Sequence, residues 1–302
     1  MDIFKPILMK FWSITEKNDE KRIASQTPTA GITQICDLPY IADGTREHLL
    51  DIYYPEGTTE KLPVIVDVHG GGWLYGYKEI NKYYCLKLAQ KGFLVASINY
   101  RLAHSCGFKE QIQDIFSAFS WLHDNLKDYP ADTDNVFLVG DSAGGQFVSV
   151  SAAICGSERM QKDFSVTPSL FFKAIGAICP AVDLASPNFI MNVNLKSLLG
   201  DKPKENPLYK YMDYNNVAYL GLPPFYIVSA SGDFLQKQAK KLHEILDRHG
   251  VENVFYFYTD LLDGKKLQHV FSVVNPYSEP AAREIQTMTD FFKSKMSVKE
   301  SV

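Results

Sequence analysis

The sequence predicts an α/β fold in which helices cover both faces of a mostly parallel central sheet. Short apolar segments bounded by turn residues recur along the chain and have the length of buried strands. Stretches with helical spacing separate most of them, and this alternation is typical of βα units. The predicted strands are 51–54, 63–68, 94–100, 136–139, 174–179, 225–230 and 254–258, and the predicted helices are 80–90, 108–126, 147–154 and 236–248.

The length of 302 residues suits one large open sheet, so residues 1–302 are expected to form a single domain. Two segments, 1–45 and 185–222, interrupt the alternation. The first contains an apolar stripe at helical spacing: Phe4, Ile7, Leu8, Phe11 and Trp12. The second is an irregular stretch with several prolines, longer than most connections in compact domains. We interpret both as parts of a small cap, with plain packing on the domain body as the alternative for the first.

Charge and cysteine usage narrow the class of protein. The net charge of −4 gives no basic surface, so a nucleic-acid partner is not expected. Five cysteines without metal-type spacing favour reduced thiols over disulfides or zinc, and no metal site is expected. We see neither a signal peptide nor a run long enough to span a bilayer. The sequence therefore predicts a cytoplasmic protein without stable membrane insertion, and it leaves a homodimer open.

The strongest local motif surrounds Ser142. The predicted strand 136–139 leads into Gly140-Asp141-Ser142-Ala143-Gly144-Gly145, and a helical pattern begins near Phe147. A serine at such a sharp turn needs small residues two positions before and after it, because strand and helix must approach closely. The alternative is a glycine-rich turn with an incidental serine. The strand and helix on either side favour Ser142 as a nucleophile.

A second glycine motif, His69-Gly70-Gly71-Gly72-Trp73, follows the predicted strand 63–68. Attack on a carbonyl creates an oxyanion, and unobstructed backbone amides must already point at it. We expect the amides of Gly71, Gly72 and Ala143 to form this oxyanion hole, since Ala143 opens a helix. A phosphate-binding loop is the alternative, but neither of the usual nucleotide-binding glycine patterns is present.

A serine hydroxyl also needs a base and a carboxylate that orients the base. Of the seven histidines, His269 lies in a late loop, where this chain order of triad residues places the base. Asp233 follows the predicted strand 225–230 and precedes a helix, so it lies at the carboxyl edge of the sheet. Asp260 and Asp263 are rivals in the loop that leads to His269. The predicted catalytic residues are Ser142, Asp233 and His269, although Asp233 could merely cap its helix and His269 could be an ordinary loop residue.

These motifs resemble the hormone-sensitive-lipase-like branch of the α/β-hydrolase carboxylesterase and lipase family. Its HGGGW, YRL and GDSAGG motifs match His69–Trp73, Tyr100–Leu102 and 140–145. Its strand-end Asp and late His match Asp233 and His269. The resemblance covers most of the chain from residue 51 onward.

The resemblance implies an α/β-hydrolase fold and hydrolysis of small or short-acyl carboxylic esters through an acyl-enzyme, without any cofactor. It also implies that 1–45 and 185–222 shape the substrate pockets as a cap. The family's usual Pro after the Asp, its second Asp three residues on and its Gly after the His are replaced here. Phe234, Gln236 and Val270 stand at these positions.

Four aromatic residues lie close enough in sequence to the two glycine loops to line the pocket, although aromatic residues more often serve in packing: Trp73, Tyr75, Tyr77 and Tyr100. Of these, Trp73, Tyr75 and Tyr100 are the candidate substrate-binding residues. Two other functions remain open. An amidase or peptidase uses the same triad on the same fold. Some relatives of this branch are non-catalytic ligand-binding proteins that have lost the triad histidine. The presence of His269 argues against this function for the present chain.

Overall fold

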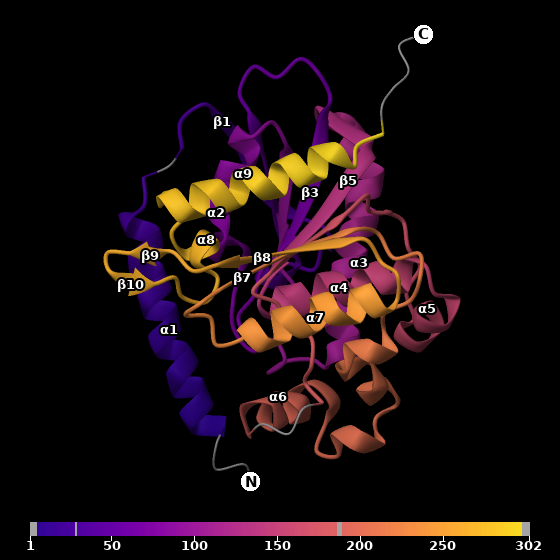
Figure 1. Cartoon of the computed structure of the whole chain (residues 1–302). Helices are drawn as coiled ribbons and strands as arrows, with labels where there is room; N and C mark the ends of the chain where they lie inside the picture. The colour runs from indigo at the N-terminus through magenta and orange to yellow at the C-terminus, as the bar shows by residue number, and fades with distance from the viewer. Residues whose placement is uncertain (1–4, 28, 186–188, 298–302) are drawn as a thin grey trace.

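The computed structural model describes residues 5–27, 29–185 and 189–297. Its centre is a twisted sheet of eight strands in the order β1-β2-β4-β3-β5-β6-β7-β8 (Figure 1). The strands are β1 (Ile32–Pro39), β2 (Leu49–Pro55), β3 (Leu62–Val68), β4 (Leu94–Ile98), β5 (Ala131–Asp141), β6 (Ile175–Ile178), β7 (Phe225–Ala230) and β8 (Asn253–Tyr258). Strands β3 to β8 are mutually parallel, and the pairs of β2 with β1 and β4 are antiparallel. The predicted mostly parallel sheet is confirmed.

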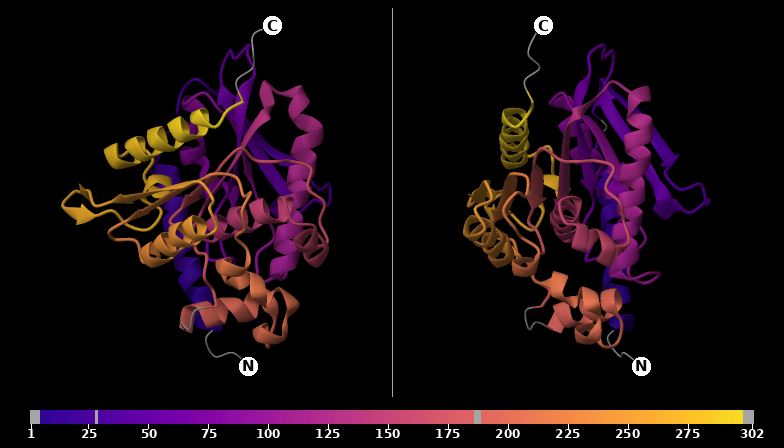
Figure 2. Two further views of the ribbon diagram at one scale, coloured as in Figure 1. Left: turned by 45° about the vertical axis from the view of Figure 1, so that its right-hand side comes forward. Right: turned by 90° about the vertical axis from the view of Figure 1, so that its right-hand side faces the viewer.

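Helices cover both faces of this sheet, as the two turned views show (Figure 2). Alternate residues of a strand point to opposite faces, so Val64 and Val66 of β3 join one buried core and Ile65 joins the other. The first core is closed by α3 (Phe108–Asn125), α4 (Ala143–Cys155), α5 (Glu158–Phe164) and α7 (Gln236–Arg248). The second is closed by α2 (Lys82–Gln90), α8 (Phe271–Val274) and α9 (Glu279–Ser294). None of the described helices is both long and apolar enough to cross a membrane.

The N-terminal helix α1 (Lys5–Ser25) is longer than the apolar stripe predicted. Phe4 of that stripe lies outside the described residues, as do the side chains of Ile7, Leu8 and Phe11. The indole of Trp12 is stacked on the phenol ring of Tyr75, with ring centroids 5.3 Å apart. Further along, Asp19 accepts a hydrogen bond from the Tyr75 hydroxyl, and the Arg22 guanidinium donates to the carbonyl of Ile80. Helix α1 therefore packs on the loop that follows β3.

The segment 185–222 forms helix α6 (Phe189–Leu199) and short 3-10 turns, with residues 186–188 outside the described part. The turns are Pro203–Glu205, Pro207–Met212 and Tyr214–Asn216. The hydroxyls of Tyr214 and Tyr219 donate to the carbonyls of Ser149 and Ala153, which fixes the segment on α4. Figures 1 and 2 show α6 at the same end of the molecule as the first turns of α1. Both segments predicted as a cap thus contact elements that carry the glycine motifs.

A fully buried carboxyl group, Glu284 of α9, gives the fold a specific pH response. It lies between α9 and the sheet near Tyr84 and Tyr226, and burial raises its pKa to about 8. In the unfolded chain this group would ionise near its ordinary pKa of about 4.3. Between pH values of about 4.3 and 8, Glu284 therefore keeps its proton in the folded state but loses it in the unfolded chain. The free energy of unfolding falls as the pH rises through this range.

Replacement of Glu284 by Gln is expected to raise the melting temperature at pH 8.5 and to leave it nearly unchanged at pH 4.5. The amide cannot ionise, so the loss of roughly 1.4 kcal/mol per unit of pKa shift disappears in the variant. Thermal unfolding at both pH values measures this effect. Glu279→Gln, on the exposed first turn of the same helix, is the matched control and should not change either value beyond a degree or so. Equal gains for both variants would contradict the assignment to burial.

Candidate active site

Ser142 occupies a strained turn between β5 and α4. Its backbone angles are φ 53° and ψ −116°, which a residue other than glycine seldom adopts. A Cβ atom at Gly140 would lie 2.4 Å from the carbonyl oxygen of Gly144, and one at Gly144 would lie 2.0 Å from that of Val68. Both overlaps involve backbone, so only glycine fits at either position. The two glycines let helix and strands approach and expose the serine at the carboxyl edge of the sheet.

Three predicted residues from distant parts of the chain form one hydrogen-bonded chain. The Nε2 atom of His269 lies 2.9 Å from the Ser142 hydroxyl oxygen, and its Nδ1 atom lies 2.6 Å from Oδ1 of Asp233. Asp233 is fully buried and also accepts hydrogen bonds from the Ser229 hydroxyl and the Leu235 amide. Burial raises the pKa of Asp233, but the hydrogen bond and charge of His269 outweigh it and hold the pKa below its ordinary value. Asp233 is therefore ionised at neutral pH, and its partners hold it facing the imidazole.

The turn after β7 is tied directly to the segment that carries His269. The Gly232 amide donates to the carbonyl of Leu267, and a Cβ at Gly232 would lie 2.6 Å from that same oxygen. A β-bridge joins Gly232 to Gln268. These contacts lie one residue away from Asp233 and one or two residues away from His269. They fix the distance between the carboxylate and the imidazole through the backbone.

The loop after β3 presents free amide hydrogens near the serine. Gly71 and Gly72 have φ angles of 115° and 59°, and the Tyr75 amide closes the loop by donating to the Gly71 carbonyl. Among the described residues, no acceptor faces the amides of Gly71 and Gly72. The Ala143 amide belongs to the first turn of α4, where amides lack partners within the helix. The three amides predicted as an oxyanion hole are thus unpaired within the described part of the chain.

A pair of buried carboxyl groups holds this loop against the turn at Ser142. Asp141 accepts hydrogen bonds from the Gly70 amide at 3.0 Å and from the Asn81 side chain at 2.9 Å. Asn81 also donates to Asp67, which accepts from the Ser97 hydroxyl as well. Burial raises the pKa of Asp141, and burial together with the charge of Asp141 raises the pKa of Asp67 to about 7. The pair therefore retains a proton near neutral pH and connects β3, β5 and the glycine loop.

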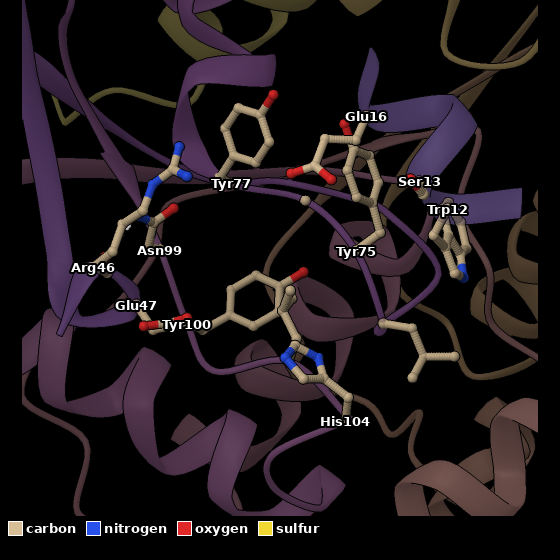
Figure 3. A pocket seen from close by; sticks show the side chains of 13 residues that line it. Trp12, Ser13, Glu16, Arg46, Glu47, Tyr75, Tyr77, Asn99, Tyr100 and His104 are labelled. Atoms are coloured by element: carbon tan, nitrogen blue, oxygen red, sulfur yellow. Dashed lines mark hydrogen bonds between the residues drawn. The ribbon is translucent and has the colours of Figure 1, made fainter. Parts of the chain in front are cut away.

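The candidate substrate-binding residues are divided between a cavity and the core. A cavity of about 260 Å³ lies between α1, the loop after β3 and the loop after β4 (Figure 3). Tyr75 and Tyr100 line it, although the Tyr100 hydroxyl is buried and donates to the His69 carbonyl. Trp73 is only 2% exposed, and its indole nitrogen donates to Gln146. The environment of Trp73 is that of a packed core residue.

Part of the cavity wall could not be selected from the sequence, and Ser142, Asp233 and His269 are not among the residues that line this cavity. Trp12 of α1 and Arg46 lie on opposite sides of the cavity in Figure 3, and Tyr77 also lines it. Trp12 belongs to the apolar stripe that predicted a cap, whereas no motif marks Glu16, Arg46 and His104, which come together only in the folded chain. Phe234 is marked in the sequence in one way, because it stands where the family usually has a proline after the Asp.

Metal binding is the other chemistry that this cluster could support. Cys179, Asp233 and His269 offer ligand atoms within 4.8 Å of one another. However, Asp233 and His269 already form a short hydrogen bond, and the Cys179 sulfur accepts a hydrogen bond from the Val270 amide. Burial raises the pKa of the Cys179 thiol, which disfavours the thiolate that metals bind. The observed contacts fit a hydrogen-bonded site better than a metal centre.

Several proteins of known structure or curated sequence are similar to this chain. Esterase B from Lactobacillus rhamnosis superposes with a TM-score of 0.91 at 27% identity, covering 98% of this chain and 96% of that one. It has also been solved with a tributyrin phosphonate inhibitor. Carboxylesterase NlhH of Mycobacterium tuberculosis is 27% identical over 69% of this chain and 68% of its own length. Esterase LipQ of the same organism is 26% identical over 66% of this chain, which spans about half (49%) of that relative's length.

The fold and these similarities place the chain in the class of carboxylic ester hydrolases with the α/β-hydrolase fold, as its resemblance to the hormone-sensitive-lipase-like branch implied. A family model matches more than half of the chain. The chain belongs to the BD-FAE family, whose model matches residues 50–246.

Proposed function

We propose that the protein hydrolyses small or short-acyl carboxylic esters with Ser142 as nucleophile, His269 as general base and Asp233 as the carboxylate that orients it. The observation that carries this proposal is the hydrogen-bonded chain from Ser142 through His269 to Asp233. The Nδ1–H of His269 donates to the Asp233 carboxylate, so Nε2 of His269 is left to accept the proton of the Ser142 hydroxyl.

In the proposed reaction, His269 takes the Ser142 proton as the hydroxyl oxygen attacks the ester carbonyl. The amides of Gly71, Gly72 and Ala143 donate to the oxyanion that forms. The intermediate collapses as His269 returns the proton to the alcohol oxygen, and the acyl group stays on Ser142. Water, activated by the same imidazole, then releases the acid. This mechanism uses only side chains, backbone amides and water.

Two observations support a short acyl group. The Trp12 ring lies over the glycine loop, so close that a Cβ at Gly72 would be 2.6 Å from Cζ2 of the indole. This ring restricts the space beside the proposed oxyanion hole. Esterase B, one of the similar structures, has been solved with a tributyrin phosphonate, whose acyl chains are short.

The direct test is a panel of 4-nitrophenyl esters from acetate to palmitate, with the corresponding anilide of acetate added to separate ester from amide cleavage. We expect the highest kcat/KM with acetate and butyrate and little cleavage of the anilide. Ser142→Ala serves as the blank. Equal rates for the wild-type protein and this variant would exclude the proposal.

Removal of the Trp12 ring should change the preference for acyl length. In Trp12→Ala we expect the ratio of kcat/KM for the octanoate ester to that for the butyrate ester to rise by about fivefold. This corresponds to about 1 kcal/mol, the contribution of roughly one further methylene held in an apolar site once the ring is removed. Trp121→Ala, in the C-terminal half of α3 and outside the cavity lining, controls for the general loss of an indole. An unchanged ratio in Trp12→Ala would show that this ring does not limit the acyl site.

A further inference from the structure

Phe234 is an exposed aromatic residue in direct contact with the imidazole of His269. Its side chain is 74% exposed, although it stands between Asp233 and Leu235, which are both buried. The ring centroids of Phe234 and His269 are 4.2 Å apart, at an interplanar angle of 44°. A large apolar side chain this exposed loses the stabilisation that burial would give it. The ring lies beside the imidazole that the proposed mechanism uses, where a substrate bound at Ser142 would contact it.

The backbone holds Phe234 in this position. The Asp233 amide donates to the Ala230 carbonyl, and the Leu235 amide donates to the Asp233 carboxylate. The side chain of Gln236 donates to the Asp233 carbonyl. The turn is therefore closed by hydrogen bonds on both sides of Phe234. The ring is presented by a fixed turn that also carries the proposed triad carboxylate.

The strand order decides which part of an ester lies beside this ring. The glycine loop follows β3 and Phe234 follows β7, and these strands lie on opposite sides of β5, which leads to Ser142. With the carbonyl oxygen of the ester directed at the amides of Gly71 and Gly72, the alcohol oxygen can lie on the opposite side of the acyl carbon, toward His269. During acylation the bond between the acyl carbon and the alcohol oxygen breaks, and the Nε2 proton of His269 moves to that oxygen. The alcohol oxygen must therefore lie within about 3 Å of the imidazole.

We propose that Phe234 forms the wall of the alcohol subsite and selects esters whose alcohol carries an aromatic or cyclic apolar group. This inference rests on the proposed ester hydrolysis at Ser142. An alcohol carbon skeleton bound to the oxygen beside Nε2 reaches the ring that packs on the imidazole. A planar apolar group stacks there and covers the exposed ring, whereas a two-carbon alcohol is too small to do so. The expected substrates join a short acyl group to an aromatic or cyclic alcohol.

The test compares benzyl butyrate with ethyl butyrate, which share the acyl group and both release an unactivated alcohol. The value of kcat/KM covers the steps through acylation, when the alcohol is still bound. In Phe234→Ala we expect kcat/KM for benzyl butyrate to fall by about fivefold to tenfold, the worth of one aromatic contact, while that for ethyl butyrate changes by less than about twofold. Phe234→Tyr keeps the ring and should retain the preference.

Phe171→Ala is the matched control, because Phe171 is also exposed, at 66%, but precedes β6 at the opposite end of the strand from the site. It should leave both substrates unaffected. Equal losses for the two esters in Phe234→Ala would show that the ring only positions His269, and no loss for either would show that it contacts no substrate; both results overturn the inference. If the wild-type protein cleaves neither ester nor any member of the acyl panel, the proposed function itself fails.

Discussion

Replacement of Asp233 by Asn is expected to lower kcat by about four orders of magnitude while the protein stays folded. Asp233 accepts the Nδ1 hydrogen of His269 at 2.6 Å, and an amide group at this place can instead donate to that nitrogen. The imidazole would then carry its hydrogen on Nε2 and could not accept the Ser142 proton. Steady-state kinetics with 4-nitrophenyl butyrate measures the loss, and circular dichroism confirms the fold.

The chain offers two matched controls for this variant. Asp260 and Asp263 lie in the loop before His269 and were the rival carboxylates on sequence grounds. In the structure Asp260 forms an ion pair with Arg283, and Asp263 is exposed in a turn with φ 51°. Asp260→Asn and Asp263→Asn should therefore keep near wild-type turnover. A large loss in either, with turnover preserved in Asp233→Asn, would move the carboxylate role to that residue.

The second large effect is expected at Gly71. A Cβ here would lie 2.0 Å from the carbonyl oxygen of Tyr75, and the φ angle of 115° is strained for any side chain. Gly71→Ala must shift the loop, so its amide no longer points at the oxyanion. Loss of one such donor lowers kcat by about 100-fold to 1,000-fold. The same ester assay with the folded variant measures this.

Gly44→Ala separates the backbone strain expected in Gly71→Ala from the overlap of the new Cβ with the Tyr75 carbonyl. Gly44 also has a positive φ, 79°, but no atom lies within 4 Å of the Cβ position. This control therefore introduces backbone strain without an overlap, and it should lose some stability but no activity. A Gly71→Ala protein with wild-type activity would remove the glycine loop from the proposed mechanism.

The sequence was most informative where one local requirement dictates the residue type. A Cβ atom at Gly140, Gly144 or Gly71 would lie 2.0 to 2.4 Å from a backbone carbonyl oxygen, so these positions require glycine. Such requirements appear as short motifs, so the turn, the loop and the neighbouring strands could be predicted. Asp233 could be selected because the end of β7 places it at the same edge of the sheet as Ser142.

The surroundings of the site depend on packing that no local pattern encodes. Helix α1 continues through the polar residues after Trp12, where no apolar stripe predicts it. Asp67 stands inside an apolar strand, and its partner Asn81 lies 14 residues away in the chain. The edge strand β1 pairs only with β2 and is mostly half-exposed, so its alternation is weak. Of these elements, α1 lines the cavity through Trp12, Ser13 and Glu16, and its packing on the loop after β3 is not encoded in any local pattern.

Helix α9 is a different case, because its signals were present in the sequence but were not used. Ser278 caps its first turn by accepting from the Ala281 amide, and Pro280 lies in the first turn. Ile285, Met288 and Phe292 follow at spacings of three and four and are buried. The cytoplasmic location, the single domain and the homodimer left open by the sequence stay predictions.

The most direct test of the central claim is labelling with a dialkyl or aryl alkylphosphonate, followed by mass spectrometry of the intact and digested protein. Such a reagent reacts with a serine only where a base activates it and an oxyanion hole holds the phosphoryl oxygen. We predict one adduct per chain, on the peptide that contains Ser142, with hydrolysis of 4-nitrophenyl butyrate lost in proportion to labelling. Labelling of the wild-type protein on another residue would contradict the assignment of Ser142 as the nucleophile. So would a Ser142→Ala protein that still hydrolyses the ester and loses this activity on labelling.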